Sequence, residues 1–227
     1  MKPLVIAHRG ASSVELENSL AAFRAAASQG ADGVELDVHA TADGELIVHH
    51  DETIDGTSIA QSSAAAIAAL RLKNGEPVPT LSQALAAIAP RLQVFIEVKT
   101  LAARWDARLF DAMDRGPNPS GYAVHSFDHR IVQRLGKQRD GLRCGVLSVS
   151  YDVRPLVALQ DAGASILWQE RSLVDQDLVR VLHEAGRSLF IWTVDEPADL
   201  AGFVALGVDG LCTNFPGRAR QAVAAAA

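Results

Sequence analysis

The chain has 227 residues, 48% of them hydrophobic, and its 21 Lys and Arg against 27 Asp and Glu give a formal net charge of −6. A chain of this length buries a sizeable core, and its ordinary apolar content excludes a disordered protein. The acidic balance, without any local Lys/Arg cluster, argues against nucleic acid as a partner.

Short apolar runs rich in β-branched residues alternate with Ala-rich amphipathic segments along the whole chain, which predicts alternating strands and helices. Strands are predicted at Pro3–Ala7, Gly33–His39, Gln93–Lys99, Gly121–His125, Leu142–Leu147, Ser165–Trp168, Ser188–Val194 and Val208–Cys212. Helices are predicted near 18–29, 81–89, 104–115, 129–138, 153–162, 175–185, 197–206 and 216–225.

Polar residues and glycines mark the expected helix ends. Asn18, Thr80 and the pair Asp195–Glu196 directly precede helical patterns and are expected at helix N-termini. Glycines that follow helical stretches, where a left-handed cap is expected, are Gly30, Gly163, Gly186 and Gly207.

Residues 40–79 interrupt the alternation. A Thr-Ala-Asp-Gly turn precedes the run Glu45–His50, which predicts a hairpin extending the second strand. The polar remainder, with a short Ala-rich helix at 62–70, is expected to cover one face of the fold.

Eight strand–helix units in this length predict the α/β class and a compact (β/α)₈ TIM barrel. Residues 1–227 would then form a single domain, with a small hairpin-and-helix insertion after the second strand. A doubly wound open sheet is the alternative, which strand counting alone does not exclude.

The chain carries no sign of a membrane segment or a disulfide framework. Cys144 and Cys212 lack metal-ligand spacing and end apolar runs, as small buried side chains do. No run reaches about 18 apolar residues, and the first residues lack a signal-peptide core. We therefore expect a cytoplasmic protein without stable membrane insertion; the pattern leaves the oligomeric state open.

In a (β/α)₈ barrel the active site lies at the carboxyl ends of the strands, so ionisable residues at these ends are the candidate functional residues. The first predicted strand ends in His8-Arg9-Gly10. A histidine in this place is often only a hydrogen-bonded structural residue, but the adjoining Arg and Gly favour an anion site.

Carboxylates gather on two predicted strands. Glu35 and Asp37 share one face by alternation, and Glu97 shares a face with Lys99 on the next barrel strand. Close carboxylates repel unless a cation lies between them, and oxygen ligands suit Mg²⁺ or Ca²⁺. The alternative is an internal ion pair; in the metal interpretation Lys99 is free to contact a phosphate oxygen.

Other polar and aromatic residues remain ambiguous from the pattern. Alternation places His49 and His50 on opposite faces, so at most one faces the site. Trp192, Ser126 and Phe127 follow predicted strands and either belong to the core or line a pocket.

An ordered set of motifs resembles the glycerophosphodiester phosphodiesterase family, whose fold is a (β/α)₈ barrel. The motifs span nearly the whole chain: His8-Arg9-Gly10, Glu17-Asn18-Ser19, Glu35-Leu-Asp37, Thr41-Ala-Asp-Gly44, His50-Asp51, Glu97-Val-Lys99, Ser126-Phe127, Trp192-Thr-Val and Gly207–Thr213.

The resemblance implies hydrolysis of a glycerophosphodiester to sn-glycerol 3-phosphate and an alcohol, in one family proposal through a cyclic phosphate. It implies His8 and His50 as the general acid/base pair, and so selects His50 over His49. It further implies one divalent cation, Mg²⁺ or Ca²⁺, held by Glu35, Asp37 and Glu97, with Arg9 and Lys99 on phosphate. Glu17, Ser126, Phe127 and Trp192 complete the expected substrate-binding set.

The chain departs from the family pattern at a few positions. Asp195 replaces the usual Asn, and Asn214 replaces the usual Asp of a late Thr-Asp pair. An arginine common after His-Asp is absent, and Leu16 and Ser19 are mild changes. His39, His125 and His129 are expected outside catalysis, His39 least firmly because it shares the face of Glu35 and Asp37.

Two rival functions remain. The first is a phosphodiesterase of lysophospholipids on the same barrel, which should show an exposed apolar loop; residues 51–79 are polar and lack aromatic residues. The second is a non-catalytic barrel that binds phosphorylated ligands, which has little need for two histidines, three carboxylates and a lysine at one mouth.

Overall fold

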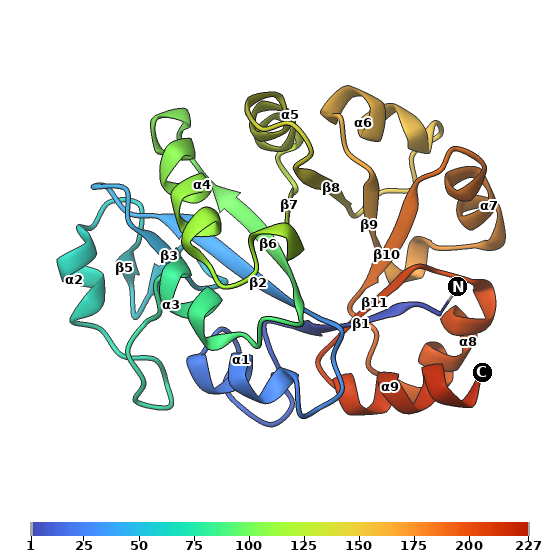
Figure 1. Cartoon of the computed structure of the whole chain (residues 1–227), viewed down its shortest axis with the longest axis horizontal. Helices are drawn as coiled ribbons and strands as arrows, with labels where there is room; N and C mark the ends of the chain where they lie inside the picture. Colours follow the sequence, from blue (N-terminus) through green and yellow to red (C-terminus); the bar gives the residue numbers. More distant parts are fainter. Residues whose placement is uncertain (1, 227) are drawn as a thin grey trace.

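The computed structural model describes residues 2–226, which form a closed barrel of eight parallel strands (Figure 1). The barrel strands are β1 (Leu4–His8), β2 (Gly33–Ala40), β6 (Gln93–Thr100), β7 (Tyr122–Ser126), β8 (Arg143–Ser148), β9 (Ile166–Glu170), β10 (Ser188–Trp192) and β11 (Gly210–Thr213). Strand β1 pairs with both β2 and β11, which closes the ring. The (β/α)₈ prediction is confirmed, and the open-sheet alternative is wrong.

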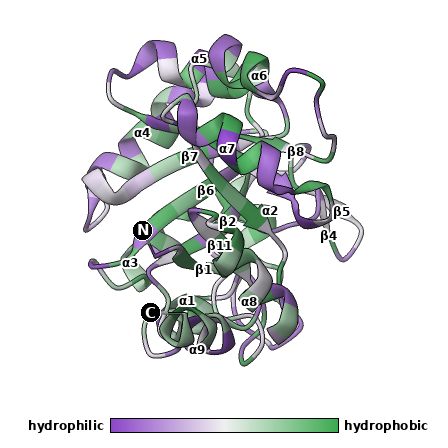
Figure 2. Cartoon of the chain, turned by 90° about the vertical axis from the view of Figure 1, so that its right-hand side faces the viewer, coloured by the Kyte–Doolittle hydropathy of each residue, from purple (hydrophilic) through white to green (hydrophobic). Residues whose placement is uncertain are grey.

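Helices follow the barrel strands and surround them. They are α1 (Leu20–Ala26), α3 (Leu81–Ala87), α4 (Asp106–Arg115), α5 (His129–Gln138), α6 (Pro155–Ala162), α7 (Gln176–Glu184), α8 (Pro197–Leu206) and α9 (Pro216–Ala225). Their apolar faces pack on the strands, while polar residues gather on helix exteriors and loops (Figure 2). All eight predicted strand–helix units are therefore present, with ends that differ by a few residues.

Two residues expected at helix N-termini are used elsewhere. Ser19, not Asn18, caps α1 by accepting from the Ala22 amide, and Asn18 instead bonds to the Asp37 carboxylate. Helix α8 begins after Glu196, which makes no side-chain cap hydrogen bond, and Asp195 instead accepts hydrogen bonds from Thr213 at the end of β11 and from Asn214. Both exceptions place a polar side chain at the mouth of the barrel.

The segment after β2 forms the predicted excursion. Strand β3 (Leu46–Val48) pairs antiparallel with β2 outside the ring, as the hairpin pattern predicts. A second small hairpin, β4 (Thr53–Ile54) with β5 (Thr57–Ser58), was not evident from the sequence. Helix α2 (Ala64–Ala68) is shorter than the predicted 62–70, and its one buried residue, Ile67, packs into a small apolar cluster of this segment.

The barrel interior is filled by aromatic side chains. Phe95, Trp168 and Phe190 pack edge to face, with ring centroids 5.1 to 5.4 Å apart. Gly145 on β8 leaves the space that Trp168 fills, since a Cβ at position 145 would lie 2.7 Å from Trp168 Cδ1. This layer forms the floor beneath the carboxyl ends of the strands.

Replacement of Gly145 by alanine is expected to lower the free energy of unfolding by about 1–3 kcal/mol, because overpacking forces a shift of Trp168 or of the backbone. Urea unfolding of the variant measures this value. Gly141 provides the matched control because a Cβ there meets nothing within 4 Å, although its positive φ adds a separate strain. Equal stability of wild type and G145A would show that the interior accommodates the added methyl group.

Within residues 2–226, no helix has the length and apolar character needed to cross a membrane. Cys144 and Cys212 are both buried and free of disulfide bonds. Burial raises the pKa of the Cys144 thiol to about 11, so this residue behaves as a small apolar side chain, as the sequence predicts.

Candidate active site

The register of the barrel brings the predicted carboxylates and histidines to one mouth. His8 on β1 lies opposite Glu35 on β2, and Asp37 on β2 lies opposite Glu97 on β6. Glu97 in turn lies opposite His125 on β7. A cavity at this mouth is lined by His8, Arg9, Glu35, His50, Glu97, Lys99, His125, Phe127, Leu147, Trp168, Trp192 and Cys212.

The Asp37 carboxylate is the electrostatic centre of the site. Its Oδ1 lies 3.0 Å from Lys99 Nζ, its Oδ2 lies 3.2 Å from Arg9 Nε, and Asn18 Nδ2 donates to Oδ2 at 2.8 Å. Burial alone would raise the pKa of Asp37, but Lys99 and Arg9 outweigh it and hold the pKa below its usual value. Asp37 is therefore a fixed anion that positions the two cations.

Burial and neighbouring negative charge disfavour the ionised form of the other two carboxylates, Glu35 and Glu97. Burial, and then the Asp37 charge, raise the pKa of Glu97 to about 7 and that of Glu35 well above its usual value. Glu97 is paired with Lys99 at 2.6 Å, and Glu35 Oε2 accepts from the Arg9 amide at 3.0 Å. Glu35 Oε1 is buried without a hydrogen-bond partner among the described residues.

These residues fit a divalent cation. Carboxylate oxygens are hard ligands, and a cation between Glu35 and Glu97 would stabilise both in their charged form. The unpartnered Glu35 oxygen is the kind of atom that a bound ion satisfies.

His8 is held in one tautomer by residues from the far end of the chain. Its Nδ1 lies 2.8 Å from Asn214 Oδ1, and Asn214 Nδ2 donates to Asp195 Oδ2 at 2.7 Å. Because the Asp195 carboxylate only accepts, the Asn214 amide is oriented with its oxygen toward His8. His8 must therefore donate from Nδ1, which leaves Nε2 as a proton acceptor in the neutral ring.

Burial, and then the Arg9 charge, lower the pKa of His8 below its usual value. The ring is therefore neutral at physiological pH, as a general base requires.

His50 rather than His49 lines the mouth cavity. His50 Nδ1 lies 2.7 Å from Asp51 Oδ1, so this ring also donates from Nδ1 and presents Nε2. His49 Nδ1 instead contacts the backbone oxygen of Asp51 at 3.0 Å. The buried His39 contacts the His50 carbonyl at 3.1 Å and supports the loop that carries His50.

Of the other predicted substrate-binding residues, Phe127 and Trp192 line the mouth cavity, whereas Glu17 and Ser126 do not. Phe127 and Trp192 pack edge to face at 5.6 Å and both line the mouth cavity. Glu17 binds Arg9 through two 3.0 Å hydrogen bonds. Ser126 does not line the cavity, since its hydroxyl donates to the Val98 carbonyl at 2.7 Å and accepts from the Asp128 amide.

His125, which the sequence analysis expects outside catalysis, is a titratable residue that also lines this mouth. It is 2% exposed, its ring stacks on Trp168 at 4.3 Å, and burial lowers its pKa to about 3. Alternation along β7 signals its inward direction, because Ala123 faces the interior two positions earlier.

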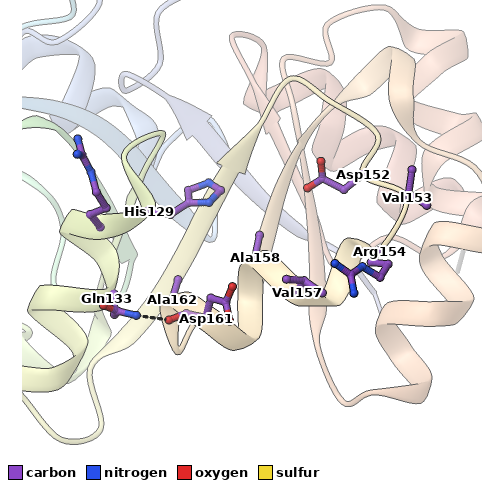
Figure 3. Close-up of a pocket in the computed structure, with 10 residues that line it drawn as sticks. His129, Gln133, Asp152, Val153, Arg154, Val157, Ala158, Asp161 and Ala162 are labelled. Atoms are coloured by element: carbon purple, nitrogen blue, oxygen red, sulfur yellow. Dashed lines mark hydrogen bonds between the residues drawn. The ribbon is translucent and has the colours of Figure 1, made fainter.

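Among the cavities larger than the mouth cavity, the two with the greatest volumes lie outside the cluster of carboxylates. One, of about 820 Å³, adjoins the mouth, and His50 lines both cavities. Its charged lining residues are Glu15, Glu17, Asp51, Asp55, Arg71 and Lys73. The other, of about 530 Å³, lies between α5 and α6 (Figure 3) and contains none of the predicted site residues. In Figure 3 the Gln133 amide bridges the two helices by donating to the Asp161 carbonyl at 2.6 Å.

The fold and the site together define a barrel enzyme whose mouth combines two cations, three buried carboxylates and two oriented histidines. The chain belongs to the Glycerophosphoryl diester phosphodiesterase family, whose profile matches residues 8–218. It is accordingly a phosphodiesterase, a hydrolase of phosphoric diesters.

Relatives and solved structures agree with this assignment. A glycerophosphodiester phosphodiesterase of Caldanaerobacter subterraneus subsp. tengcongensis is 33% identical, over 95% of this chain and 96% of the relative. The crystal structure of one from Parabacteroides distasonis superposes with a TM-score of 0.90 at 25% identity, over 99% and 98% of the two chains. A phosphodiesterase of Oleispira antarctica, solved with the product sn-glycerol-3-phosphate, has the same fold at 21% identity, a TM-score of 0.90 and coverage of 98% and 97%.

Proposed function

We propose that the chain hydrolyses glycerophosphodiesters to sn-glycerol 3-phosphate and an alcohol, with one bound Mg²⁺ or Ca²⁺. The observation that carries the proposal is the convergence of His8, His50, Arg9 and Lys99 on one cavity beside Glu35 and Glu97. The product bound in the Oleispira antarctica structure supports the choice of substrate.

Arg9 and Lys99 bind the phosphate in this proposal. Both are held at the mouth by Asp37, and each keeps further N–H donors for substrate oxygens. Glu35, Asp37 and Glu97 would hold the divalent cation, which when bound would neutralise charge on the phosphoryl oxygens. Glu17 orients Arg9, while Phe127 and Trp192 form an apolar wall for the glycerol carbons, with Ser126 supporting the loop of Phe127.

The two histidines move the protons. His8, neutral and with Nε2 unprotonated, takes the proton from a glycerol hydroxyl as that oxygen attacks phosphorus. His50, whose Nδ1 donates to Asp51, gives a proton from Nε2 to the departing alcohol oxygen. The resulting cyclic phosphate is opened by water with the two roles reversed, which regenerates both rings. The alcohol leaves toward the 820 Å³ cavity that His50 also lines.

Metal-stripped protein is expected to release no glycerol 3-phosphate from glycerophosphocholine, and addition of Mg²⁺ or Ca²⁺ is expected to restore release. Without the cation, the negative charge that develops on the phosphoryl oxygens in the transition state would face Glu35, Asp37 and Glu97 with no metal ion to balance it. An enzyme-coupled assay follows the product, and phosphorus NMR under single-turnover conditions detects the cyclic phosphate. Release that is insensitive to chelation, by a folded sample, would contradict the metal assignment; no trapped cyclic species would favour direct attack by water.

A second candidate function is favoured by one specific observation. Exposed large apolar side chains gather in the loops at the mouth of the barrel, with Val153 100% and Val149 60% exposed after β8. Tyr151, Phe127 and Val14 complete this group, which we call the apolar rim. A lysophospholipid phosphodiesterase needs such an exposed apolar loop, although the insertion itself is polar.

Replacing Val149 and Val153 with serine is expected to leave hydrolysis of glycerophosphocholine unchanged. If the lysophospholipid function operates, the same variant loses about tenfold or more in kcat/KM on lysophosphatidylcholine, because each buried valine contributes about 1.5 kcal/mol or more. Comparison of the two substrates on both proteins measures this difference. If the ratio of kcat/KM on lysophosphatidylcholine to kcat/KM on glycerophosphocholine is the same for both proteins, the apolar rim has no role in binding an acyl chain.

We also propose that residues 1–227 act as one barrel domain with the segment 40–79 as its insertion, and that the protein works in the cytoplasm. The family match over residues 8–218 supports the first part, and the two free buried cysteines are consistent with the second.

A further inference from the structure

We propose that the imidazole of His125 binds the divalent cation together with the carboxylates, which makes the site a mixed nitrogen and oxygen centre. The inference rests on the metal site of the proposed function and adds a ligand to it. Position is the first argument: His125 lies opposite Glu97 in the β6–β7 register, and both line the cavity that also contains Glu35.

The second argument is the spacing of the ligand atoms. One atom each of Glu35, Glu97 and His125 lies within 4.8 Å of the others. A divalent cation with ligands at about 2.0–2.6 Å holds adjacent ligand atoms about 3 Å apart and opposite ones about 4–5 Å apart. The three side chains therefore match the coordination sphere of a single ion.

The third argument is that His125 lacks the contacts of a structural histidine. Its Nδ1 is buried and has no hydrogen-bond partner in the described part of the chain. Buried polar atoms in native proteins are nearly always satisfied, so an unpartnered nitrogen beside an unpartnered Glu35 oxygen points to a missing ligand. The ring is held in place by its stacking on Trp168, which lies over Gly145.

Asp37 explains why a further ligand is useful. Its two oxygens are engaged by Lys99, Arg9 and Asn18, so they are less free to approach a cation than those of Glu35 and Glu97. Because Asp37 is then a weaker ligand, an imidazole nitrogen from β7, on the other side of Glu97, would supply the ligand atom that is needed. Carboxylate oxygens suit Mg²⁺, Ca²⁺ and Mn²⁺ alike, and Mn²⁺ is the transition ion among these three, so an imidazole ligand beside the carboxylates should favour Mn²⁺ over Ca²⁺.

Electron spin echo envelope modulation of the Mn²⁺-loaded protein tests the ligand directly. We expect modulation from a coordinated nitrogen, which changes when the protein is labelled with ¹⁵N-histidine and disappears in His125→Gln. The matched control is His129→Gln, because His129 bonds to the Leu147 carbonyl and lines the separate cavity of Figure 3. This control should keep the nitrogen signal.

Isothermal titration calorimetry supplies a second readout. His125→Gln is expected to weaken Mn²⁺ binding about 10-fold or more and Mg²⁺ binding by less. Wild type that binds one Mn²⁺ and releases product, but shows no nitrogen modulation, would overturn the role of His125 while leaving the proposed function intact. Wild type that binds no Mn²⁺, or Glu97→Gln that binds it as tightly, would instead overturn the carboxylate site. If the glutamine variant fails to fold, a nitrogen signal that persists in both His8→Gln and His50→Gln assigns the ligand to His125, the remaining histidine of the cavity lining, and a signal lost in either variant overturns its role.

Discussion

Alanine in place of His50 is expected to lower kcat on glycerophosphocholine about 10²–10⁴-fold while leaving metal affinity unchanged. General acid–base catalysis by a positioned side chain contributes this factor. His50 lines the same cavity as His8, and its hydrogen bond to Asp51 directs Nε2 away from that carboxylate. The hydrogen bonds and ion pairs of the described residues join the His50 side chain to Asp51 and to no carboxylate of the proposed metal site, so Mn²⁺ or Mg²⁺ binding should survive.

His49→Ala is the matched control for this prediction. His49 is the adjacent residue, and its ring contacts the backbone of the same loop; it lines the 820 Å³ cavity but not the mouth cavity where the protons move. Steady-state kinetics should give near-wild-type kcat for His49→Ala and almost none for His50→Ala. Near-wild-type activity of His50→Ala would move the proton-transfer role to another group.

Exchange of Asp195 and Asn214 is expected to shift the acid limb of the kcat/KM pH profile upward by about 1–3 pH units. In the wild type, His8 Nδ1 lies 2.8 Å from the Asn214 amide oxygen, which in turn is oriented by Asp195. The double variant Asp195→Asn/Asn214→Asp keeps one amide and one carboxylate in this network but places the carboxylate directly against His8 Nδ1. A carboxylate there stabilises the imidazolium and raises the pKa of His8, which burial and Arg9 lower in the wild type.

The sign of the shift follows from the role of His8. A general base acts only when unprotonated, so kcat/KM falls as the pH drops through the pKa of the free enzyme. A higher pKa therefore removes activity at a pH where the wild type still works. Asp195→Asn alone is the control, because it keeps an amide against His8. An unchanged acid limb in the double variant would show that His8 is not the base that the profile reports.

The sequence predicted most of what local patterns encode. Strand and helix positions followed from apolar periodicity, and the α3 N-terminus from Thr80, whose capping box is present. Alternation correctly placed Glu35 and Asp37 on one face of β2, since side chains on a strand repeat every two residues. The resemblance then supplied the family, which the comparisons confirm.

Local patterns failed where a polar residue serves a distant partner. Asn18 and Asp195 have the spacing of helix caps, yet Asn18 bonds to Asp37, whose buried charge demands partners more strongly than an exposed helix end does, and Asp195 bonds to Asn214. For His125, which the sequence analysis expects outside catalysis, the local pattern gives no information on its neighbours. Nothing near it in the chain reveals that Glu35 and Glu97 lie beside it.

The sequence by itself therefore determined the order of the elements, the inward faces of the strands and the family of the enzyme. Only the closed barrel decided which inward residues meet. Closure brings His8 within 2.8 Å of Asn214, 206 positions later, and sets Asp37, Glu97 and His125 side by side on three strands. Periodicity fixes the direction of a side chain because it depends on neighbouring residues, whereas its partners depend on strand pairing across the whole chain.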